Sequence, residues 1–250
     1  MDEQTFQRRA PLHRLSSESV NQSYPGKELE VMSHAVNYHR WIVKELTPYL
    51  GNTAVEVGAG IGDLSRLLLT TPIRKLFAFE PSSDLCDMLR ENLRDESRVT
   101  VVNDFLDRSR LQDGVDSVLY INVLEHIEND REELLKVAGV VKAGASLLIF
   151  VPALSWLFSG ADRSVGHFRR YHRKPLISLV EECGFRVEKA RYFDLMGVIP
   201  WYLNFVLLKN TFDAGSVALY DKLVVPPMRV FEKVIRPPIG KNILLVARKT

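Results

Sequence analysis

A glycine-rich turn at residues 55–63, with the sequence VEVGAGIGD, is the segment whose spacing most clearly predicts chemistry. Glycines at Gly58, Gly60 and Gly62 allow a ligand to approach the backbone closely where a strand ends and a helix begins. A dinucleotide fingerprint counted from Gly58 would need a third glycine where this chain has Asp63. A carboxylate there, with Glu56, would repel a diphosphate by roughly 4 kcal/mol for unit charges about 4 Å apart at an effective dielectric of 20. The turn therefore favours a cationic ligand without phosphate.

S-adenosylmethionine meets that requirement, because it carries an ammonium and a sulfonium group and no phosphate. The E-x-G-x-G-x-G pattern of residues 56–62 resembles the glycine motif of the class I S-adenosylmethionine-dependent methyltransferases. The resemblance implies that Glu56 and the three glycines lie beside this donor, whose product is S-adenosylhomocysteine. It also implies that Tyr38, on a helix before the motif, covers the donor.

Three later segments keep the order of the same family. Glu80, 18 residues after Gly62, occupies the position from which an acidic residue accepts hydrogen bonds from both ribose hydroxyls, with Pro81 following it. By the same resemblance, Asp104 binds the adenine amino group and Phe105 lies beside the ring. Residues 120–127, YINVLEHI, resemble the family's segment after the fourth strand, which implies that the backbone near Asn122 lines the methionine portion.

Residues 162–171, DRSVGHFRRY, resemble a D-x-x-x-G-H-x-R-R-Y segment found in a branch of small-molecule methyltransferases. The resemblance implies a small or lipid-linked acceptor in natural-product or glycan biosynthesis. His167 is the first candidate for a general base, because an unperturbed imidazole titrates near pH 6.5, and His126 is the second. Arg169 and Arg170 could bind a carboxylate or phosphate, and Tyr171 could orient the acceptor. Structural roles for these side chains remain open at this point.

Several kinds of methyltransferase are disfavoured by missing motifs. No D/N-P-P-Y segment follows the fourth predicted strand, and neither Cys86 nor Cys183 follows a proline, so nucleic-acid amino and cytosine C5 methylation are not expected. No H-E-x-x-H motif or recognisable cluster of histidines and carboxylates is present, so no metal is predicted. No continuous basic tract typical of nucleic-acid binding is present either.

The elements that must position these residues alternate between strand and helix. This alternation predicts a parallel sheet with helices on both faces. The resemblance implies a Rossmann-like, seven-stranded methyltransferase sheet with an N-terminal helical cap and a helical insert before the last strand. Strands are expected at 53–57, 75–79, 98–102, 116–121, 146–151, 185–192 and 242–249, and helices at 28–49, 62–69, 82–93, 130–140 and 174–183.

Residues 1–27 are polar and are interpreted as a loose arm, and residues 28–250 as the methyltransferase domain, with 28–49 as its cap helix. Residues 193–241 form an insert that contains two Pro-Pro pairs and many apolar side chains. It is interpreted as an apolar lid whose Trp201 and Tyr202 contact the acceptor; a small additional core and a homodimer interface are alternatives. Its apolar stretch 195–208 has 14 residues, fewer than the roughly 20 that a bilayer span needs, so interfacial membrane contact is a weaker interpretation.

The composition limits the classes of protein to which this chain can belong. The chain has 250 residues, of which 46% are hydrophobic and 26% charged, as in an ordinary globular protein. Two distant cysteines and the absence of an apolar N-terminal segment predict a cytoplasmic protein without a disulfide framework. Residues 1–150 carry 17 basic and 23 acidic side chains, a net −6, and residues 151–250 carry 16 and 8, a net +8. This asymmetry favours a cationic cofactor in the first part and an anionic substrate in the second.

The sequence thus predicts transfer of a methyl group to oxygen, nitrogen or carbon of the acceptor. Two alternatives remain: an enzyme that binds the donor but catalyses a cyclisation, and a non-catalytic donor-binding protein or membrane-surface adaptor that uses its basic half.

Overall fold

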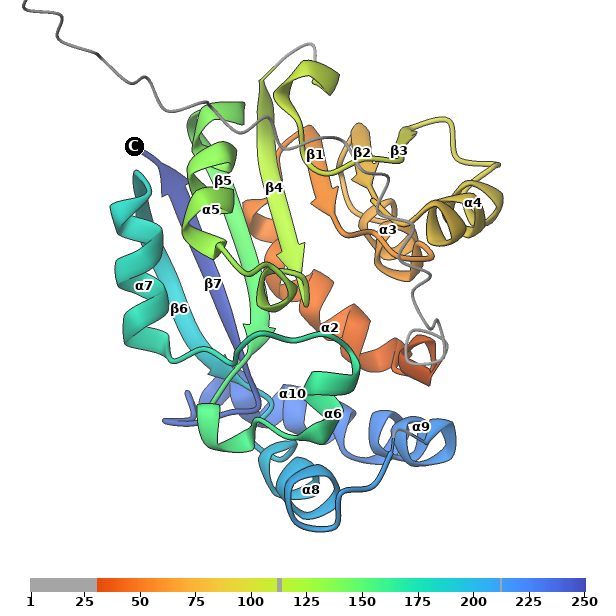
Figure 1. The fold of residues 1–250 in the computed structure, drawn as a ribbon, viewed down its shortest axis with the longest axis vertical. Coiled ribbons are helices and arrows are strands. Elements are labelled where there is room, and N and C mark those ends of the chain that lie inside the picture. Colours follow the sequence, from red (N-terminus) through yellow and green to blue (C-terminus); the bar gives the residue numbers. More distant parts are fainter. Residues whose placement is uncertain (1–30, 112–113, 212) are drawn as a thin grey trace, which may run out of the picture.

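Seven strands form one sheet in the order β3-β2-β1-β4-β5-β7-β6 in the computed structural model, which describes residues 31–111, 114–211 and 213–250 (Figure 1). The central strands are continuous apolar runs, as expected for strands covered on both faces. Their bounds are β1 (Thr53–Val57), β2 (Lys75–Phe79), β3 (Val99–Val102), β4 (Val115–Ile121), β5 (Val141–Pro152), β6 (Phe185–Phe193) and β7 (Asn242–Lys249). The seven-stranded α/β fold expected from the sequence is confirmed.

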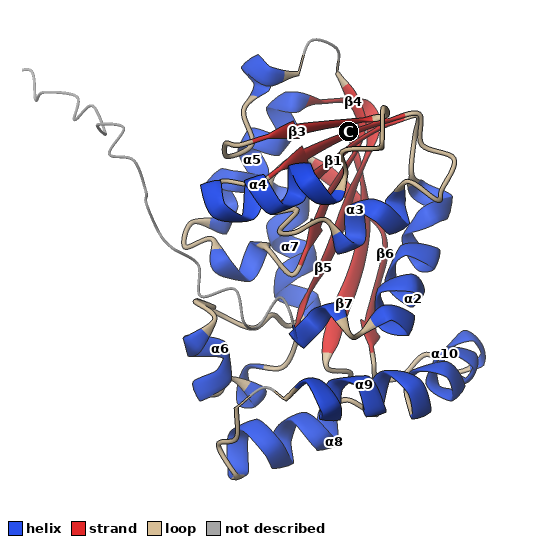
Figure 2. Ribbon diagram, turned by 90° about the vertical axis from the view of Figure 1, so that its right-hand side faces the viewer, coloured by secondary structure: helices blue, strands red, loops and turns tan. Residues whose placement is uncertain are grey.

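Two layers of helices enclose the sheet. Buried side chains of α5 and α7 pack on one face, and those of α2, α3, α4 and α10 pack on the other. Figure 2 shows α7 and α2 on opposite sides of the strands. The α-helices are α2 (Val36–Leu46), α3 (Asp63–Leu68), α4 (Ser83–Asn92), α5 (Asp130–Val140), α6 (Gly160–Ser164), α7 (Arg173–Glu182), α8 (Val198–Trp201), α9 (Ala214–Leu223) and α10 (Val225–Val234). Shorter helical turns are η1 (Thr47–Tyr49), η2 (Arg108–Arg110), η3 (Leu124–His126), η4 (Ser155–Leu157) and η5 (Tyr202–Leu207), the last a π-helix.

The sheet is not parallel throughout, which corrects the inference from strand–helix alternation. β7 pairs antiparallel with both β5 and β6. The reason lies in the connection after β6, whose two ends meet: Lys241 N donates to Asp194 O at 3.0 Å. Because the chain re-enters the sheet at the edge where β6 left it, β7 must run in the opposite direction.

Two predicted boundaries are also wrong. β5 begins at Val141, directly after α5, rather than at residue 146, because Val141 already pairs with Val115 across an irregular register. The helix expected at 28–49 is interrupted: residues 31–33 are helical, the chain turns at His34, and α2 begins at Val36. The proposed arm, residues 1–27, lies outside the described residues.

The connection between β6 and β7 contributes α8, η5, α9 and α10, which the strand–helix pattern did not resolve. These helices lie together at one end of the molecule, beyond the carboxyl ends of the parallel strands (Figures 1 and 2). No helix among the described residues is long and apolar enough to cross a bilayer. The connection therefore stands where it can border a site at that edge of the sheet.

One carboxylate of this connection holds the beginning of α2. The residue before α2 is Ala35, which has no capping side chain. Asp221 of α9 takes that role, because its two carboxylate oxygens accept hydrogen bonds from Asn37 N at 2.9 Å and Tyr38 N at 2.8 Å. Two backbone donors at the helix start are thereby satisfied from a segment 183 residues away.

Asp221→Ala is expected to lower the free energy of unfolding by about 1–2 kcal/mol, because it leaves two backbone N–H groups at the start of α2 without acceptors. Chemical denaturation measures the change. Asp87→Ala is the control, since Asp87 is exposed on α4 and pairs with the exposed Arg90 at 2.8 Å, a contact that contributes little to stability. An equal loss in both variants would contradict a special role for the contact between α9 and α2.

Candidate functional site

A cavity of about 220 Å³ opens at the carboxyl ends of β1 and β4. Its wall combines segments that are distant in sequence: the glycine turn, the start of α2, the segment after β4, the segment after α6, α8 and the start of β7. The residues concerned are Met32, Tyr38, His39, Glu56, Gly58, Ala59, Gly60, Ile61, Asp63, Leu64, Ile121, Asn122, Glu125, His126, Pro152, Val165, His167, Arg170, Trp201, Lys241 and Asn242. Both distinctive sequence segments therefore border one cavity.

The glycine turn is shaped by positive backbone angles. Gly58 has φ +68° and Gly62, the residue before α3, has φ +96°. A Cβ atom on Gly58 would lie 2.6 Å from a methyl carbon of Val123, so a side chain cannot be accommodated there without displacement. The turn thus brings bare backbone to the cavity wall, as the sequence predicts.

Glu56 lies at the cavity wall and is only 3% exposed. Its Oε2 accepts a hydrogen bond from Ser65 Oγ at 2.5 Å. Burial raises the pKa of Glu56 to about 7, against the opposing effect of Ser65. A cationic ligand nearby would favour the ionised carboxylate, so this environment fits a donor with positive charges better than a diphosphate.

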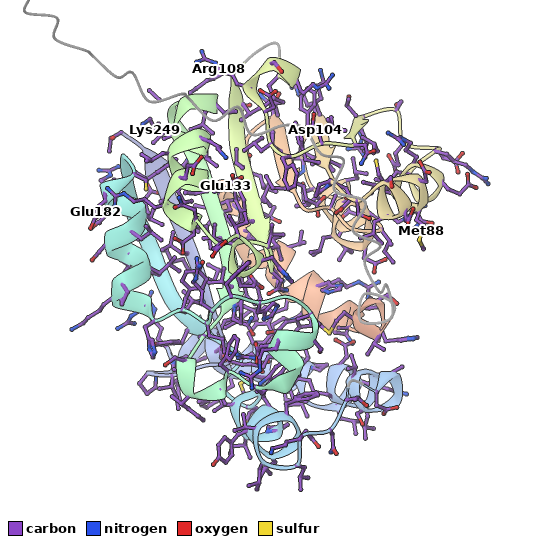
Figure 3. All side chains as sticks on the ribbon, in the orientation of Figure 1. Met88, Asp104, Arg108, Glu133, Glu182 and Lys249 are labelled. Atoms are coloured by element: carbon purple, nitrogen blue, oxygen red, sulfur yellow. The ribbon has the colours of Figure 1, made fainter. Side chains whose placement is uncertain are left out.

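Glu80 and Asp104 have other contacts in the structure. The Glu80 carboxylate accepts from Gly60 N at 2.8 Å and from Ser82 N at 2.9 Å, and so ties the glycine turn to the segment after β2. Asp104 Oδ1 accepts a hydrogen bond from Phe105 N, and Asp104 Oδ2 lies 3.5 Å from Arg110 Nη2. The Phe105 side chain is 65% exposed. Figure 3 places Asp104 near β3, away from α6 and α8. Glu80, Pro81, Asp104 and Phe105 do not line the cavity, and their donor contacts stay predictions.

Asn122 and Tyr38 do border the cavity. Asn122 has a φ of 54°, a strained value for a residue with a side chain, and its N donates to Phe150 O at 2.8 Å. The hydroxyl of Tyr38 donates to Asn242 Oδ1 at 2.9 Å. Burial and the nearby Asp194 raise the pKa of Tyr38, so this phenol stays protonated. It supplies a fixed polar edge to the wall.

Asp162 organises the segment after β5. Its Oδ1 accepts from His167 Nδ1 at 3.0 Å and from Arg170 Nε at 2.8 Å. Its Oδ2 accepts from Ser159 N at 2.9 Å, which closes a capping box at the start of α6. Burial alone would raise the pKa of Asp162, but the His167 hydrogen bond and the Arg170 guanidinium lower it overall. Asp162 is therefore the anion that holds both residues in place.

Hydrogen bonds join the segment after β4 to the segment after α6. Phe168 N donates to Glu125 O at 2.8 Å, and the Tyr171 hydroxyl donates to Asp130 Oδ2 at 2.9 Å and lies 3.2 Å from Leu124 O. The guanidinium of Arg169 donates to Ile127 O at 3.0 Å and lies 2.8 Å from Asp130. Arg169 and Tyr171 thus fix one segment against the other and do not line the cavity, whereas Arg170 does.

Glu125 faces the cavity without a partner. It is fully buried, and neither of its carboxylate oxygens has a hydrogen-bond partner. Its Oε1 lies 3.8 Å from His167 Nε2. Burial raises the pKa of Glu125 to about 8. A buried polar group without a partner is costly, so this carboxyl group is a candidate for contact with a bound molecule.

His126 also lies beside His167, with 4.6 Å between the ring centres. Burial and the neighbouring His167 lower the pKa of His126 to about 4, so its imidazole is neutral near pH 7. Glu125, His126 and His167 offer ligand atoms that all lie within 4.8 Å of one another. Such a set could hold a metal ion, and the absence of a metal stays a prediction.

The two aromatic residues proposed from α8 and η5 differ in position. Trp201 lines the cavity, its Nε1 donates to Leu157 O at 3.1 Å, and the Arg170 guanidinium lies 4.4 Å from its ring centre. Tyr202 is 41% exposed and contacts Trp156 edge to face at 5.8 Å. The π-helix begins at Tyr202, and such turns are frequent at functional sites.

Several cavity residues were not identified from sequence as site residues. Glu125 and Asp162 lie within the two segments that the sequence analysis identified. The sequence signal for them was their spacing from a histidine, one residue before His126 and five residues before His167. Lys241 carries no such signal: it reaches the cavity only because β7 begins there, with its ammonium 3.1 Å from Asp194. His39 lines the cavity through the orientation of α2, and burial lowers its pKa.

Residues 55–147 match the family model for a methyltransferase domain. This range contains the glycine turn, β2, β3 and the segment after β4, and ends within β5.

Solved structures with the same fold include a SAM-dependent methyltransferase from Archaeoglobus fulgidus, 16% identical, with a TM-score of 0.56 over 89% of this chain and 99% of that one. The mitomycin 7-O-methyltransferase MmcR is 16% identical, with a TM-score of 0.56 over 92% of this chain and 59% of that one. The [4+2]-cyclase SpnF is 13% identical, with a TM-score of 0.55 over 86% and 81%.

The buried carboxyl group of Glu125 predicts a pH-dependent stability. Because its folded pKa is raised from 4.5 to about 8, its contribution is complete below about pH 4.5 and is lost as the pH rises through about 8. Glu125→Gln should therefore lose less stability than the unsubstituted protein between about pH 6 and pH 9, by on the order of a few kcal/mol. Chemical denaturation at each pH measures the difference. Glu91→Gln, an exposed change on α4, is the control, and parallel pH profiles for Glu125→Gln and the unsubstituted protein would contradict the raised pKa.

Proposed function

We propose that this chain, whose residues 55–147 match a methyltransferase domain, is a class I S-adenosylmethionine-dependent methyltransferase that methylates a small or lipid-linked acceptor held between His167 and Trp201. The observation that carries the proposal is the common cavity: the glycine turn and the group Glu125, His126 and His167 border the same space. Donor and acceptor can then meet without a large movement of the chain.

The donor supplies an electrophilic methyl carbon and leaves as S-adenosylhomocysteine. Two features of this chain fit the donor: the backbone at Gly58, where a side chain would clash with Val123, and the carboxyl group of Glu56. Burial raises the pKa of Glu56 to about 7, so a nearby cation would favour its ionised form. We assign the ribose to Glu80 and the adenine to Asp104 and Phe105, with Pro81 beside the ribose. Asn122 and Tyr38 would border the methionine portion.

The chain's own residues can hold and remove the acceptor proton. Asp162 accepts the hydrogen bond from His167 Nδ1, which leaves the lone pair of Nε2 available. Nε2 is the atom that faces Glu125, at 3.8 Å from its Oε1. A hydroxyl group within hydrogen-bond distance of Nε2 could transfer its proton to His167 as an oxygen lone pair attacks the methyl carbon, and S-adenosylhomocysteine leaves. An ammonium group would first lose a proton to Nε2 and then attack with the nitrogen lone pair that this frees. His126 is the second candidate base, although its low pKa makes it a weaker one.

The acceptor end of the cavity combines apolar and cationic surface. The Trp201 ring gives a flat apolar wall, and Arg170 over that ring gives a fixed positive charge. This pairing suits a ring or chain that carries an anionic or strongly polar group. The fold of the mitomycin 7-O-methyltransferase, which acts on a small molecule, supports an acceptor of this class, in natural-product or glycan biosynthesis. Whether oxygen, nitrogen or carbon is methylated depends on which nucleophile reaches Nε2.

A second candidate activity follows from the fold shared with a [4+2]-cyclase. In that case the donor would stay intact and the acceptor would rearrange in the same cavity.

Mass spectrometry of products distinguishes the two activities. Small-molecule and lipid extracts of the source cells, incubated with the protein and S-adenosylmethionine carrying a trideuterated methyl group, should yield a product in which that group replaces one hydrogen. Formation of S-adenosylhomocysteine should match it one to one. A rearranged product of unchanged mass, without S-adenosylhomocysteine, would establish the cyclase instead.

His167→Ala is expected to lower kcat by about 100-fold or more, because the acceptor proton loses its base, while the affinity for S-adenosylhomocysteine stays unchanged. Steady-state kinetics and calorimetric titration measure the two quantities. His172→Ala is the matched control, because His172 is exposed and contacts Ser155 rather than the cavity. Full activity of His167→Ala across the pH range would remove His167 as the base and leave His126 to be tested.

Glu80→Gln is expected to weaken binding of S-adenosylhomocysteine at least tenfold, about 1.4 kcal/mol, because the amide accepts less strongly from the ribose hydroxyls and from Gly60 N. Calorimetric titration measures the affinity, and thermal unfolding checks that the fold persists. Glu91→Gln, on the exposed face of α4, should bind as the unsubstituted protein does. Equal affinity in both variants would contradict the ribose contact.

A further inference from the structure

The helices between β6 and β7 expose an unusual amount of apolar surface. Of the 19 large hydrophobic side chains that are exposed among the described residues, 13 lie between residues 196 and 239. We call them the apolar face. Its members are Met196, Ile199, Tyr202, Leu203, Leu207, Leu208, Leu219, Leu223, Val230, Phe231, Val234, Ile235 and Ile239. Exposed apolar side chains gathered in one segment favour a site of interaction.

The acidic and basic side chains of the segment between β6 and β7 differ in exposure. Three of its four acidic side chains are buried: Asp194, Asp221 and Glu232. Each is used internally, as Asp194 pairs with Lys241 and Glu232 pairs with Arg191 at 2.9 Å. The fourth, Asp213, is exposed and caps α9.

Four of the five basic side chains of the described residues 195–240 are exposed, and the fifth, Arg229, is half-buried. Lys209, Lys222, Lys233 and Arg236 are all exposed, and they stand next to members of the apolar face along the chain. The outer surface of the described residues 195–240 therefore combines apolar side chains with four cations and one anion. This composition complements an anionic lipid surface, where apolar groups enter the interface and lysines and arginines meet the headgroups.

A second copy of the chain fits this surface less well. A two-fold symmetric dimer through the apolar face would bring the same four cations of each copy toward one another. The edge-to-face pair of Trp156 and Tyr202 adds exposed aromatic residues with polar tips, which are typical of the membrane–water boundary.

The apolar face also adjoins the cavity. Trp201 lines the cavity wall, while its neighbours Ile199, Tyr202 and Leu203 are exposed on the outside. Both views place α8, α9 and α10 at the end of the molecule toward which the parallel strands point (Figures 1 and 2). A surface bound to these helices would lie next to the acceptor end of the cavity.

We propose that the apolar face, with its exposed lysines and arginine, docks the protein on the surface of an anionic bilayer, so that the head of a lipid-linked acceptor reaches the cavity beside Trp201. Docking itself needs no catalysis; the choice of a lipid-linked acceptor rests on the proposed methyl transfer. The contact is interfacial, with side chains of α8, η5, α9 and α10 entering the headgroup region.

Co-sedimentation with vesicles tests the docking. The full chain should bind vesicles of phosphatidylcholine with phosphatidylglycerol, bind pure phosphatidylcholine more weakly, and lose affinity as salt is added. The double variant Leu207→Glu, Val234→Glu should bind at least tenfold more weakly. Its matched control, Met88→Glu with Leu135→Glu, changes exposed apolar residues of α4 and α5 and should bind normally.

A second pair of variants tests the charges. Replacing Lys209, Lys222, Lys233 and Arg236 with glutamine should weaken binding and flatten its salt dependence. The same change at Arg74, Lys75, Lys174 and Arg186, which are exposed on other elements, should have a smaller effect. Unchanged thermal unfolding and unchanged affinity for S-adenosylhomocysteine confirm that each variant is folded.

Failure to bind anionic vesicles, or equal loss in test and control variants, would overturn the proposal. A dimer in analytical ultracentrifugation that Leu207→Glu, Val234→Glu dissociates, without vesicle binding, would assign the apolar face to a second copy. Vesicle binding does not depend on turnover, so it can fail while methyl transfer to water-soluble acceptors persists. Conversely, vesicle binding without any methylated product would support membrane docking and contradict the proposed methyl transfer.

Discussion

The part of the cavity lined by His167, Arg170 and Trp201 depends on one buried carboxylate. Asp162 accepts hydrogen bonds from His167, Arg170 and Ser159, and so joins a ring nitrogen, a guanidinium and a backbone amide at a single point. An isolated anion at this depth would be costly, and the charge of Arg170 offsets that cost. Arg170 in turn lies over Trp201, so this carboxylate also contributes to the position of the Trp201 ring. Removing it would leave His167 Nδ1, Arg170 Nε and Ser159 N without this acceptor, while Arg170 would keep its bond to Ala153 O and Trp201 its bond to Leu157 O.

The part of the cavity formed by the glycine turn depends mainly on hydrogen bonds to backbone amides. Glu80 binds Gly60 N and Ser82 N, so the glycine turn and the end of β2 move as one unit. Glu56 beneath the turn is held by Ser65, with its pKa near 7. The glycine turn with Glu56 therefore suits a cationic ligand, whereas the group of Glu125, His126 and His167 offers ionisable side chains.

Sequence patterns predicted the glycine turn and the strands better than the side chains that gather around the cavity, for a physical reason. A glycine turn between an apolar strand and a helix is a local structure, so the spacing of Gly58, Gly60 and Gly62 suffices to predict it. The strands were predicted to within a residue or so, except at β5, because buried strands are continuous apolar runs. The reversal of β7 and the break at His34 depend on tertiary contacts, Lys241 with Asp194 and Asp221 with α2, which no local pattern contains. Glu125 and Lys241 reach the cavity through such contacts as well, whereas Arg169 and Tyr171, assigned to the acceptor from their motif, join two loops instead.

The meeting of Asp194 and Lys241 has a consequence for how such a protein can diverge. The intervening segment leaves and re-enters the sheet at one hydrogen bond, so the framework fixes its ends and little else. Doubling the length of a flexible loop changes its closure entropy by only about 0.6 kcal/mol. Exchange, lengthening or redesign of residues 195–240 would thus leave strand pairing largely untouched while replacing Trp201 and the whole outer face. Strand pairing and the glycine turn can therefore stay constant while residues 195–240, which contribute Trp201 to the cavity, vary.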